Sequence, residues 1–262
     1  MTKILAITNQ KGGVGKTTTT VNLAASLAST KQRVLLIDLD PQGNATMGSG
    51  IDKRDLQSSV YDVLLGSKTI SEVCKTSEAA QYDVLPANRD LAGAEIELVG
   101  LPNREMQLRN AVAEVTDKYD YILIDCPPAL NLLTLNGLCA AKRVMIPMQC
   151  EYYALEGLSD LVNTIRKVRA NLNPDLEIEG LLRTMFDPRN ALAQQVSDQL
   201  QQHFGDKVYR TVIPRNVRLA EAPSYGVPVM YHDKASKGSL AYLALAIEML
   251  NNQAAKPSSA SD

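Results

Sequence analysis

The sequence predicts an α/β fold with a mostly parallel sheet flanked by helices on both faces. Short apolar runs rich in Ile, Val and Leu alternate with longer stretches in which apolar residues recur at helical spacing. A glycine-rich segment directly follows the first apolar run and precedes the first helical stretch. This alternation is typical of parallel strands joined by crossover helices.

Composition sets broad limits on the class of protein. The chain has 262 residues, 45% of them hydrophobic, and no linker-like stretch interrupts residues 1–253, so we expect a single domain there. Residues 254–262 form a polar, Ser-rich tail that we expect to be disordered. No apolar run is long enough to span a membrane and no signal peptide is recognisable, which predicts a cytoplasmic protein.

The glycine-rich segment at residues 11–18 reads Lys-Gly-Gly-Val-Gly-Lys-Thr-Thr. Its glycines let backbone N–H groups converge on anionic oxygens, and the helix that follows adds the positive end of its dipole. In such a loop Lys16 reaches the β- and γ-phosphates of a nucleotide, and the Thr17 hydroxyl contacts Mg²⁺. The usual P-loop has glycine at position 10, where this chain has Gln10, and Lys11 is an additional lysine.

Acidic residues follow two of the predicted strands. Residues 33–37 and 121–124 are apolar enough to be strands buried on both faces. Asp38 and Asp40 follow the first of them and Asp125 follows the second. Because ligands bind at the carboxyl ends of strands in open parallel sheets, we expect these aspartates near the glycine-rich loop.

The other elements follow from periodicity and turn residues. Towards the N-terminus we expect a strand at 4–7, a helix from Lys16, a loop with a short helix at 42–56, a helix at 58–65, a strand at 82–86 and a helix around 108–115. Towards the C-terminus we expect a helix at 131–141, a strand at 143–147, a helix from Leu155, a strand at 178–185, a helix at 192–204, a strand at 208–213 and a final helix around 240–250.

Three motifs together resemble those of the deviant Walker A ATPases. They are residues 11–18, the sequence Asp-Leu-Asp-Pro-Gln-Gly-Asn at 38–44, and Asp-Cys-Pro-Pro at 125–128. Within that group the chain resembles the ParA/Soj chromosome-partitioning proteins over nearly its whole length. The resemblance implies a P-loop NTPase fold of the deviant Walker A type and slow, Mg²⁺-dependent hydrolysis of ATP.

The resemblance also implies roles for individual residues. Asp40 would position the attacking water, and Lys11 would cross to the nucleotide of a second subunit, so that ATP drives formation of a homodimer. Lys11, Lys16 and Asp40 are the implied catalytic residues, and Thr17, Asp38 and Asp125 the implied metal or switch residues. The implied nucleotide-binding residues are Lys11, Gly12, Gly13, Val14, Gly15, Lys16, Thr17, Thr18, Pro214 and Asn216.

The family resemblance further implies partners. A dimer would bind double-stranded DNA without sequence preference on the nucleoid, and a ParB-type centromere-binding protein would stimulate hydrolysis and release. The net charge of −2 provides no global attraction for DNA, but six basic residues against three acidic ones give residues 205–238 a local charge of +3. The resemblance adds Arg189 and Arg218 as DNA contacts, and the alternative is that these arginines pair with local carboxylates.

Two other classes of ATPase share the loop motif. A MinD-like membrane-surface ATPase needs a C-terminal amphipathic helix with a basic face, whereas the last predicted helix ends in Asn-Asn-Gln, so we expect no membrane partner. A nitrogenase iron-protein type needs cysteines that share a cluster between subunits. The cysteines show no Cys-x-x-Cys spacing and are expected to be buried, reduced thiols: Cys74, Cys126, Cys139 and Cys150.

Overall fold

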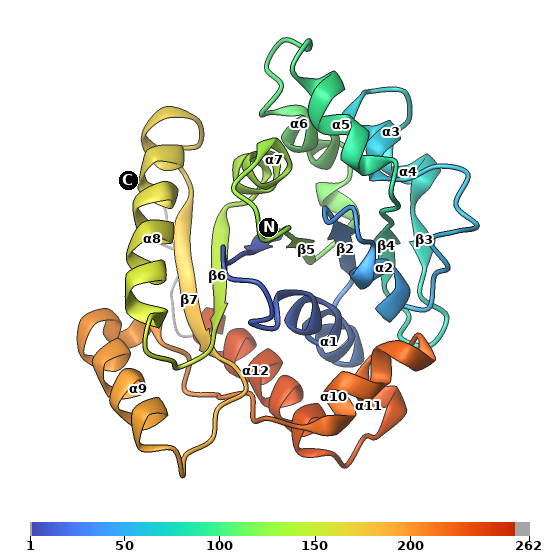
Figure 1. The fold of residues 1–262 in the computed structure, drawn as a ribbon. Coiled ribbons are helices and arrows are strands. Elements are labelled where there is room, and N and C mark those ends of the chain that lie inside the picture. The colour runs from blue at the N-terminus through green and yellow to red at the C-terminus, as the bar shows by residue number, and fades with distance from the viewer. Residues whose placement is uncertain (1, 255–262) are drawn as a thin grey trace.

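A computed structural model describes residues 2–254 as a seven-stranded sheet between two layers of helices (Figure 1). The strands lie in the order β3-β4-β2-β5-β1-β6-β7. β3 pairs antiparallel with β4, and the other pairs are parallel. The predicted fold class is therefore confirmed. The strands are β1 (Lys3–Ile7), β2 (Val34–Asp38), β3 (Lys75–Thr76), β4 (Asp83–Leu85), β5 (Tyr121–Asp125), β6 (Arg143–Met148) and β7 (Glu177–Arg183).

Helices separate the parallel strands as the sequence predicts. They are α1 (Lys16–Ser29), α2 (Asn44–Gly48), α3 (Val60–Leu64), α4 (Ile70–Val73), α5 (Leu91–Leu98), α6 (Gln107–Ala113), α7 (Leu132–Ala140), α8 (Ala154–Asn171), α9 (Ala191–Phe204), α10 (Val217–Glu221), α11 (Val229–His232) and α12 (Lys237–Ala254). Helices α9 to α12 follow β7 one after another. Short 3-10 turns are η1 (Thr116–Lys118), η2 (Gly205–Lys207) and η3 (Ala222–Tyr225). Within residues 2–254, no helix is both long and apolar enough to cross a membrane.

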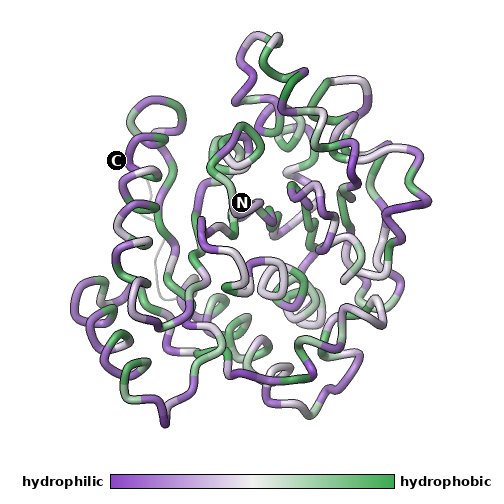
Figure 2. Tube along the Cα trace, in the orientation of Figure 1, coloured by the Kyte–Doolittle hydropathy of each residue, from purple (hydrophilic) through white to green (hydrophobic). Residues whose placement is uncertain are grey.

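Alternate residues of the central strands enter opposite layers of the core. Ile4 and Ala6 of β1 pack into the layer that contains residues of α3 and α5 to α9, whereas Leu5 and Ile7 pack into the layer with α1 and α12. Figure 2 shows hydrophobic and hydrophilic residues alternating along α8 and α9, as expected for helices with one buried face. Burial on both faces explains why the central strands read as continuous apolar runs.

The predicted strand at residues 208–213 is wrong. Val208 forms an isolated bridge to Leu181 of β7, and Pro214, just after the segment, forms another to Phe186. The guanidinium of Arg183 donates hydrogen bonds to two of the segment's backbone carbonyls, and the carboxylate of Glu248 accepts from two of the segment's backbone amides. Because side chains satisfy these backbone groups, no continuous strand ladder forms.

Several short elements were absent from the prediction, namely α4, α5, α11 and the two-residue strand β3. Elements this short carry too little periodicity to stand out from loop. Helix α12 continues to Ala254, and residues 255–262, which make up most of the predicted tail, lie outside the described residues.

Candidate nucleotide-binding site

The loop between β1 and α1 is shaped by its glycines. Gly13 and Gly15 have φ angles of 75° and 87°, in the left-handed region that glycine adopts without strain. A Cβ atom built on Gly12 or Gly13 would meet no atom within 4 Å, so the loop is open above these residues. The Thr184 hydroxyl, just after β7, donates to the Val14 carbonyl at 2.7 Å and anchors the loop from behind. The result is an open backbone cradle at the N-terminus of a 14-residue helix.

Lys16 places a cation under this cradle. Its side chain is buried, and its Nζ donates to the Lys11 carbonyl at 3.0 Å. Burial lowers the pKa of Lys16, although the nearby charges of Asp125 and Asp40 act in the opposite direction. Within residues 2–254 no carboxylate forms a salt bridge with it. An ammonium with three donors, held mainly by one carbonyl, fits a phosphate anion in the loop above it.

Asp125, at the end of β5, lies beside the first turn of α1. One carboxylate oxygen accepts a hydrogen bond from the Thr17 hydroxyl at 2.7 Å, and the other accepts from the Thr20 hydroxyl at 3.0 Å. Asp38 is its register partner on β2, and both residues are fully buried. Burial, together with the charge of Asp38, raises the pKa of Asp125. A divalent cation beside Thr17 would neutralise this concentration of buried carboxylates, so the donor set fits Mg²⁺.

Within the described part of the chain, no three His, Cys, Asp or Glu side chains are placed to hold a metal by themselves. A Mg²⁺ ion at Thr17 would therefore complete its octahedral shell with phosphate oxygens and water, as this ion commonly does. The cysteines are free thiols, buried except for the half-buried Cys74.

Asp38 and Asp40 behave differently although they are two residues apart. Asp38 is buried and uses both carboxylate oxygens to accept protein hydrogen bonds, from the Asp40 amide at 3.0 Å and from the amide and hydroxyl of Thr46 at 2.8 Å each. Asp40 is half-buried and accepts from the Gln42 amide at 2.9 Å. The structure thus brings Asp40 to the rim of the site and ties Asp38 into its wall.

Lys11 lies at the edge of the loop and pairs with Glu151, which follows β6. The two side chains are 50% and 51% exposed, and the neighbouring Tyr152 and Tyr153 are also exposed. The Lys11 amide donates to the Asn9 side-chain oxygen at 3.0 Å, which holds the start of the loop. The sequence did not single out Glu151, because no motif links it to Lys11.

The predicted adenine contacts, Pro214 and Asn216, follow the segment that runs beside β7. Pro214 forms an isolated β-bridge with Phe186. Met185 precedes Phe186, and its Cε lies 4.0 Å from a Cβ atom built on Gly15. The Asn216 side-chain oxygen accepts from the Arg218 amide at 3.1 Å and caps α10. Met185 and Phe186 therefore connect Pro214 to the phosphate loop, whereas the observed contact of the Asn216 side chain is with α10.

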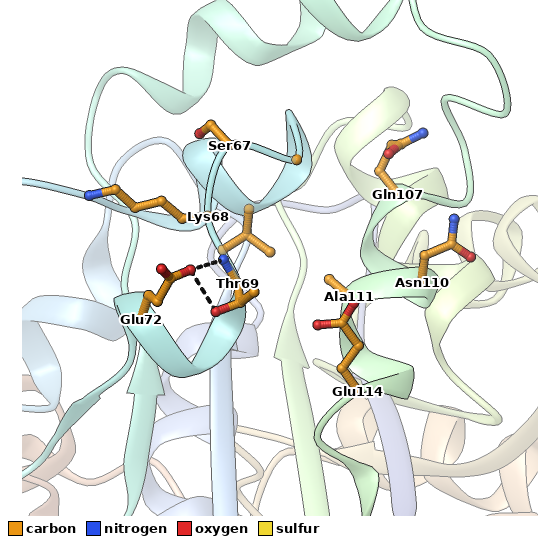
Figure 3. Close-up of a pocket in the computed structure, with 10 residues that line it drawn as sticks. Ser67, Lys68, Thr69, Glu72, Gln107, Asn110, Ala111 and Glu114 are labelled. Atoms are coloured by element: carbon orange, nitrogen blue, oxygen red, sulfur yellow. Dashed lines mark hydrogen bonds between the residues drawn. The ribbon is translucent and has the colours of Figure 1, made fainter.

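A small cavity of about 180 Å³ lies in this region. It is lined by Gln149, Cys150, Glu151, Met185, Phe186, Asp187, Asn190, Ala193 and Arg215. A second cavity, of about 240 Å³, lies between the turn before α4 and α6 (Figure 3) and includes none of the motif residues. There the Thr69 amide and hydroxyl both donate to Glu72 at 2.7 Å, so these polar groups serve to cap a helix.

The two arginines predicted to contact DNA are exposed and paired. Arg189 forms a bidentate pair with Asp187 and lowers the pKa of that carboxyl to about 2. Arg218 pairs with both Glu221 and Asp233. Both arginines therefore have local carboxylate partners, which is the alternative that the sequence left open.

Comparisons with known proteins agree with this geometry. Residues 2–178 match the family model described as an AAA domain. The chain is 56% identical to the sporulation initiation inhibitor protein Soj of Bacillus subtilis over 96% of this chain and 100% of that one. It is 51% identical to the chromosome partitioning protein ParA of Caulobacter vibrioides over 96% of this chain and 95% of that one. The chain belongs to the ParA/Soj family of chromosome-partitioning ATPases.

A solved structure extends the likeness to three dimensions. The cobyrinic acid a,c-diamide synthase from Mycobacterium smegmatis, crystallised with an ATP analogue and magnesium, has a TM-score of 0.85 and 38% identity over 97% of each chain. The ParA/Soj family resemblance that the three motifs predicted is thus confirmed by comparisons over nearly the whole chain.

Proposed function

We propose that the chain is an ATP-dependent switch for DNA segregation. It binds Mg²⁺ and ATP, dimerises around the nucleotide, binds double-stranded DNA without sequence preference, and releases it after hydrolysis stimulated by a ParB-type partner. The observation that carries the proposal is the open glycine loop above a buried Lys16 that has no carboxylate partner among the described residues, beside Thr17 and Asp125. The relatives named ParA and Soj support the cellular role.

Each part of the site has a task in this cycle. Amides of residues 11–18 and the Lys16 ammonium hold the phosphates, Thr17 and Asp125 hold the metal, and Pro214 and Asn216 contact the base. Mg²⁺-ATP, when bound, supplies the γ-phosphoryl group whose transfer to water drives the cycle. Asp38 contributes its charge from the wall of the site, because its two oxygens are already engaged by protein donors.

Asp40 and Lys11 make turnover conditional. Asp40 orients the attacking water from the rim of the site, and Lys11 acts on the nucleotide of the second subunit. Lys11 is half exposed, so it can leave Glu151 at little cost, since pairs of this exposure contribute ~0–1 kcal/mol. Hydrolysis then depends on dimerisation, which makes the ATPase a timer on the nucleoid.

ATP turnover measured with and without duplex DNA, and with and without the N-terminal peptide of a ParB-type protein from the same organism, tests the proposal. We expect slow basal turnover and a marked increase only when DNA and peptide are both present. Turnover that ignores DNA and peptide would contradict the partitioning role. Sedimentation with liposomes and ATP separates this role from that of a membrane-surface ATPase, for which the protein would pellet with the vesicles.

A further inference from the structure

Asp38 joins three segments that meet beside the phosphate loop. It ends β2, and its Oδ1 accepts the amide of Asp40 at 3.0 Å. Its Oδ2 accepts both the amide and the hydroxyl of Thr46, in α2. One buried carboxylate therefore sets where the Asp40 backbone lies relative to α2.

Thr46 extends this contact to a third segment. Its hydroxyl donates to Asp38 at 2.8 Å and accepts the amide of Ala87, just after β4, at 2.9 Å. Asp38, Thr46 and Ala87 are all 0% exposed. A hydroxyl has one proton to donate, so the proton of Thr46 is committed to Asp38, while one lone pair accepts from the Ala87 amide. Removal of the hydroxyl breaks both bonds together, and solvent does not reach the site to replace them.

The loop packs closely against the same segment. Gly43 has a φ angle of 59°, and a Cβ built on it would lie 2.7 Å from the Ala87 carbonyl oxygen. The Gly43 amide donates to the Asp40 carbonyl at 2.8 Å, which closes the turn that carries Asp40. The turn thus packs against Ala87 and is hydrogen-bonded to Asp38, which Thr46 in turn holds.

We propose that Thr46 is a positioning residue for hydrolysis. By holding Asp38 against the Asp40 amide and fixing α2 to the end of β4, it sets the position from which Asp40 orients water. Thr46 affects the rate of turnover and not the affinity for ATP, because the phosphate loop and Lys16 lie in a different segment of the chain from the turn that carries Asp40. This inference rests on the proposed role of Asp40.

Three variants test it. Thr46→Val removes the hydroxyl at nearly constant volume, Thr46→Ser keeps it, and Ser49→Ala removes another buried hydroxyl at the end of the same helix. Ser49 donates to the Ala45 carbonyl and contacts the Tyr82 hydroxyl, both at 2.7 Å, and neither partner is Asp38. We expect Thr46→Val to lower kcat ~10- to 100-fold, as for a displaced catalytic group, with KM and nucleotide affinity unchanged. Thr46→Ser and Ser49→Ala should keep wild-type kcat.

Wild-type and Asp40→Ala turnover are measured in the same assay. If turnover does not depend on Asp40, the proposed function of Asp40 fails and this inference fails with it. If turnover depends on Asp40 but Thr46→Val retains wild-type kcat, only the role of Thr46 is overturned. An equal loss in Ser49→Ala, or in Thr46→Ser, would also overturn it, because the effect would then belong to the helix and not to the hydroxyl.

Should Thr46→Val fail to fold, Thr46→Ala removes the hydroxyl without placing a methyl group against the buried carboxylate, and the same kcat loss is expected. A parallel fall in ATP affinity in Thr46→Ala would overturn the inference, since it would show that the hydroxyl holds the whole site.

Discussion

The phosphate loop and the C-terminal basic surface both carry positive charge, but the surroundings of that charge differ. The C-terminal basic surface is defined as Arg189 together with residues 205–238. Lys16 is buried and has no carboxylate partner within residues 2–254. Arg189 and Arg218 are exposed, and each is paired with a carboxylate close in sequence. Burying a cation without a counter-ion costs folding free energy unless a bound anion neutralises it. Exposed ion pairs contribute little to stability, so their presence does not indicate a function. The fold therefore identifies the first region as a site more strongly than the second.

The largest effect is expected from breaking the first region. Lys16→Gln removes the charge that we propose holds the β- and γ-phosphates, so ATP turnover should fall by ~100-fold or more. Binding of a fluorescent ATP analogue should weaken in parallel. Lys75→Gln, which removes an exposed lysine from β3, is the matched control and should leave both quantities unchanged. Unaltered binding and turnover in Lys16→Gln would defeat the assignment of the loop.

The next effect separates binding from chemistry within the same region. Asp40→Ala should bind Mg²⁺-ATP and dimerise, because the loop and Lys16 are intact, yet turnover should fall by ~100-fold. The ATP-bound dimer should then accumulate, which size-exclusion chromatography with light scattering detects. Asp55→Asn, an exposed acid further along the chain, controls for loss of charge. Wild-type turnover in Asp40→Ala would show that another group orients the water.

The sequence predicted the phosphate loop because its geometry is local to residues 11–18. It also predicted that Asp38 and Asp125 approach the loop, because the carboxyl ends of parallel strands share one edge. Interactions that depend on how separate loops pack were not predictable in this way. The Lys11–Glu151 pair joins residues 140 apart, and the Thr46–Ala87 bond joins residues 41 apart.

The wrong strand at 208–213 has a related cause. Its apolar pattern predicted a strand without a stated neighbour. In the structure the segment runs beside β7, but Arg183 and Glu248 take backbone groups that a ladder would use. The local pattern of apolar residues predicts burial and an extended backbone. It does not predict which distant side chain competes for a backbone hydrogen bond.

A smaller effect is expected at Lys11, which lies in the phosphate loop but, like Arg189 and Arg218, is exposed and paired with a carboxylate. Lys11→Ala should leave a folded protein that binds ATP but stays monomeric and hydrolyses slowly. Glu151→Gln should release Lys11 and lower the ATP concentration needed for dimerisation by at most about fivefold, since an exposed pair contributes ~0–1 kcal/mol. Light scattering across an ATP titration measures both. Normal dimerisation and turnover in Lys11→Ala would contradict its action across the interface.

The smallest effect, and the one that sharpens the comparison most, concerns the C-terminal basic surface. If Arg189 and Arg218 bind phosphates in the dimer, charge reversal should weaken binding to every duplex alike and flatten its salt dependence, with the log–log slope falling by about one for each arginine replaced. Dimerisation by ATP should be unaffected. Glu221→Gln should act in the opposite direction and tighten binding a few-fold, because it frees Arg218 from one of its two carboxylate partners.

Arg54 supplies the matched control for this last prediction. It pairs with Asp52 two residues before it, as Arg189 pairs with Asp187, and its side chain is 77% exposed, but it lies outside the basic surface. Arg54→Glu therefore makes the same charge change in the same local geometry and should leave DNA binding almost unaltered. Mobility shifts on unrelated duplexes across a salt series decide the matter. An equal loss in Arg54→Glu would show that only net charge matters, whereas binding insensitive to ATP, salt and all these substitutions would mean that DNA is held elsewhere on the molecule.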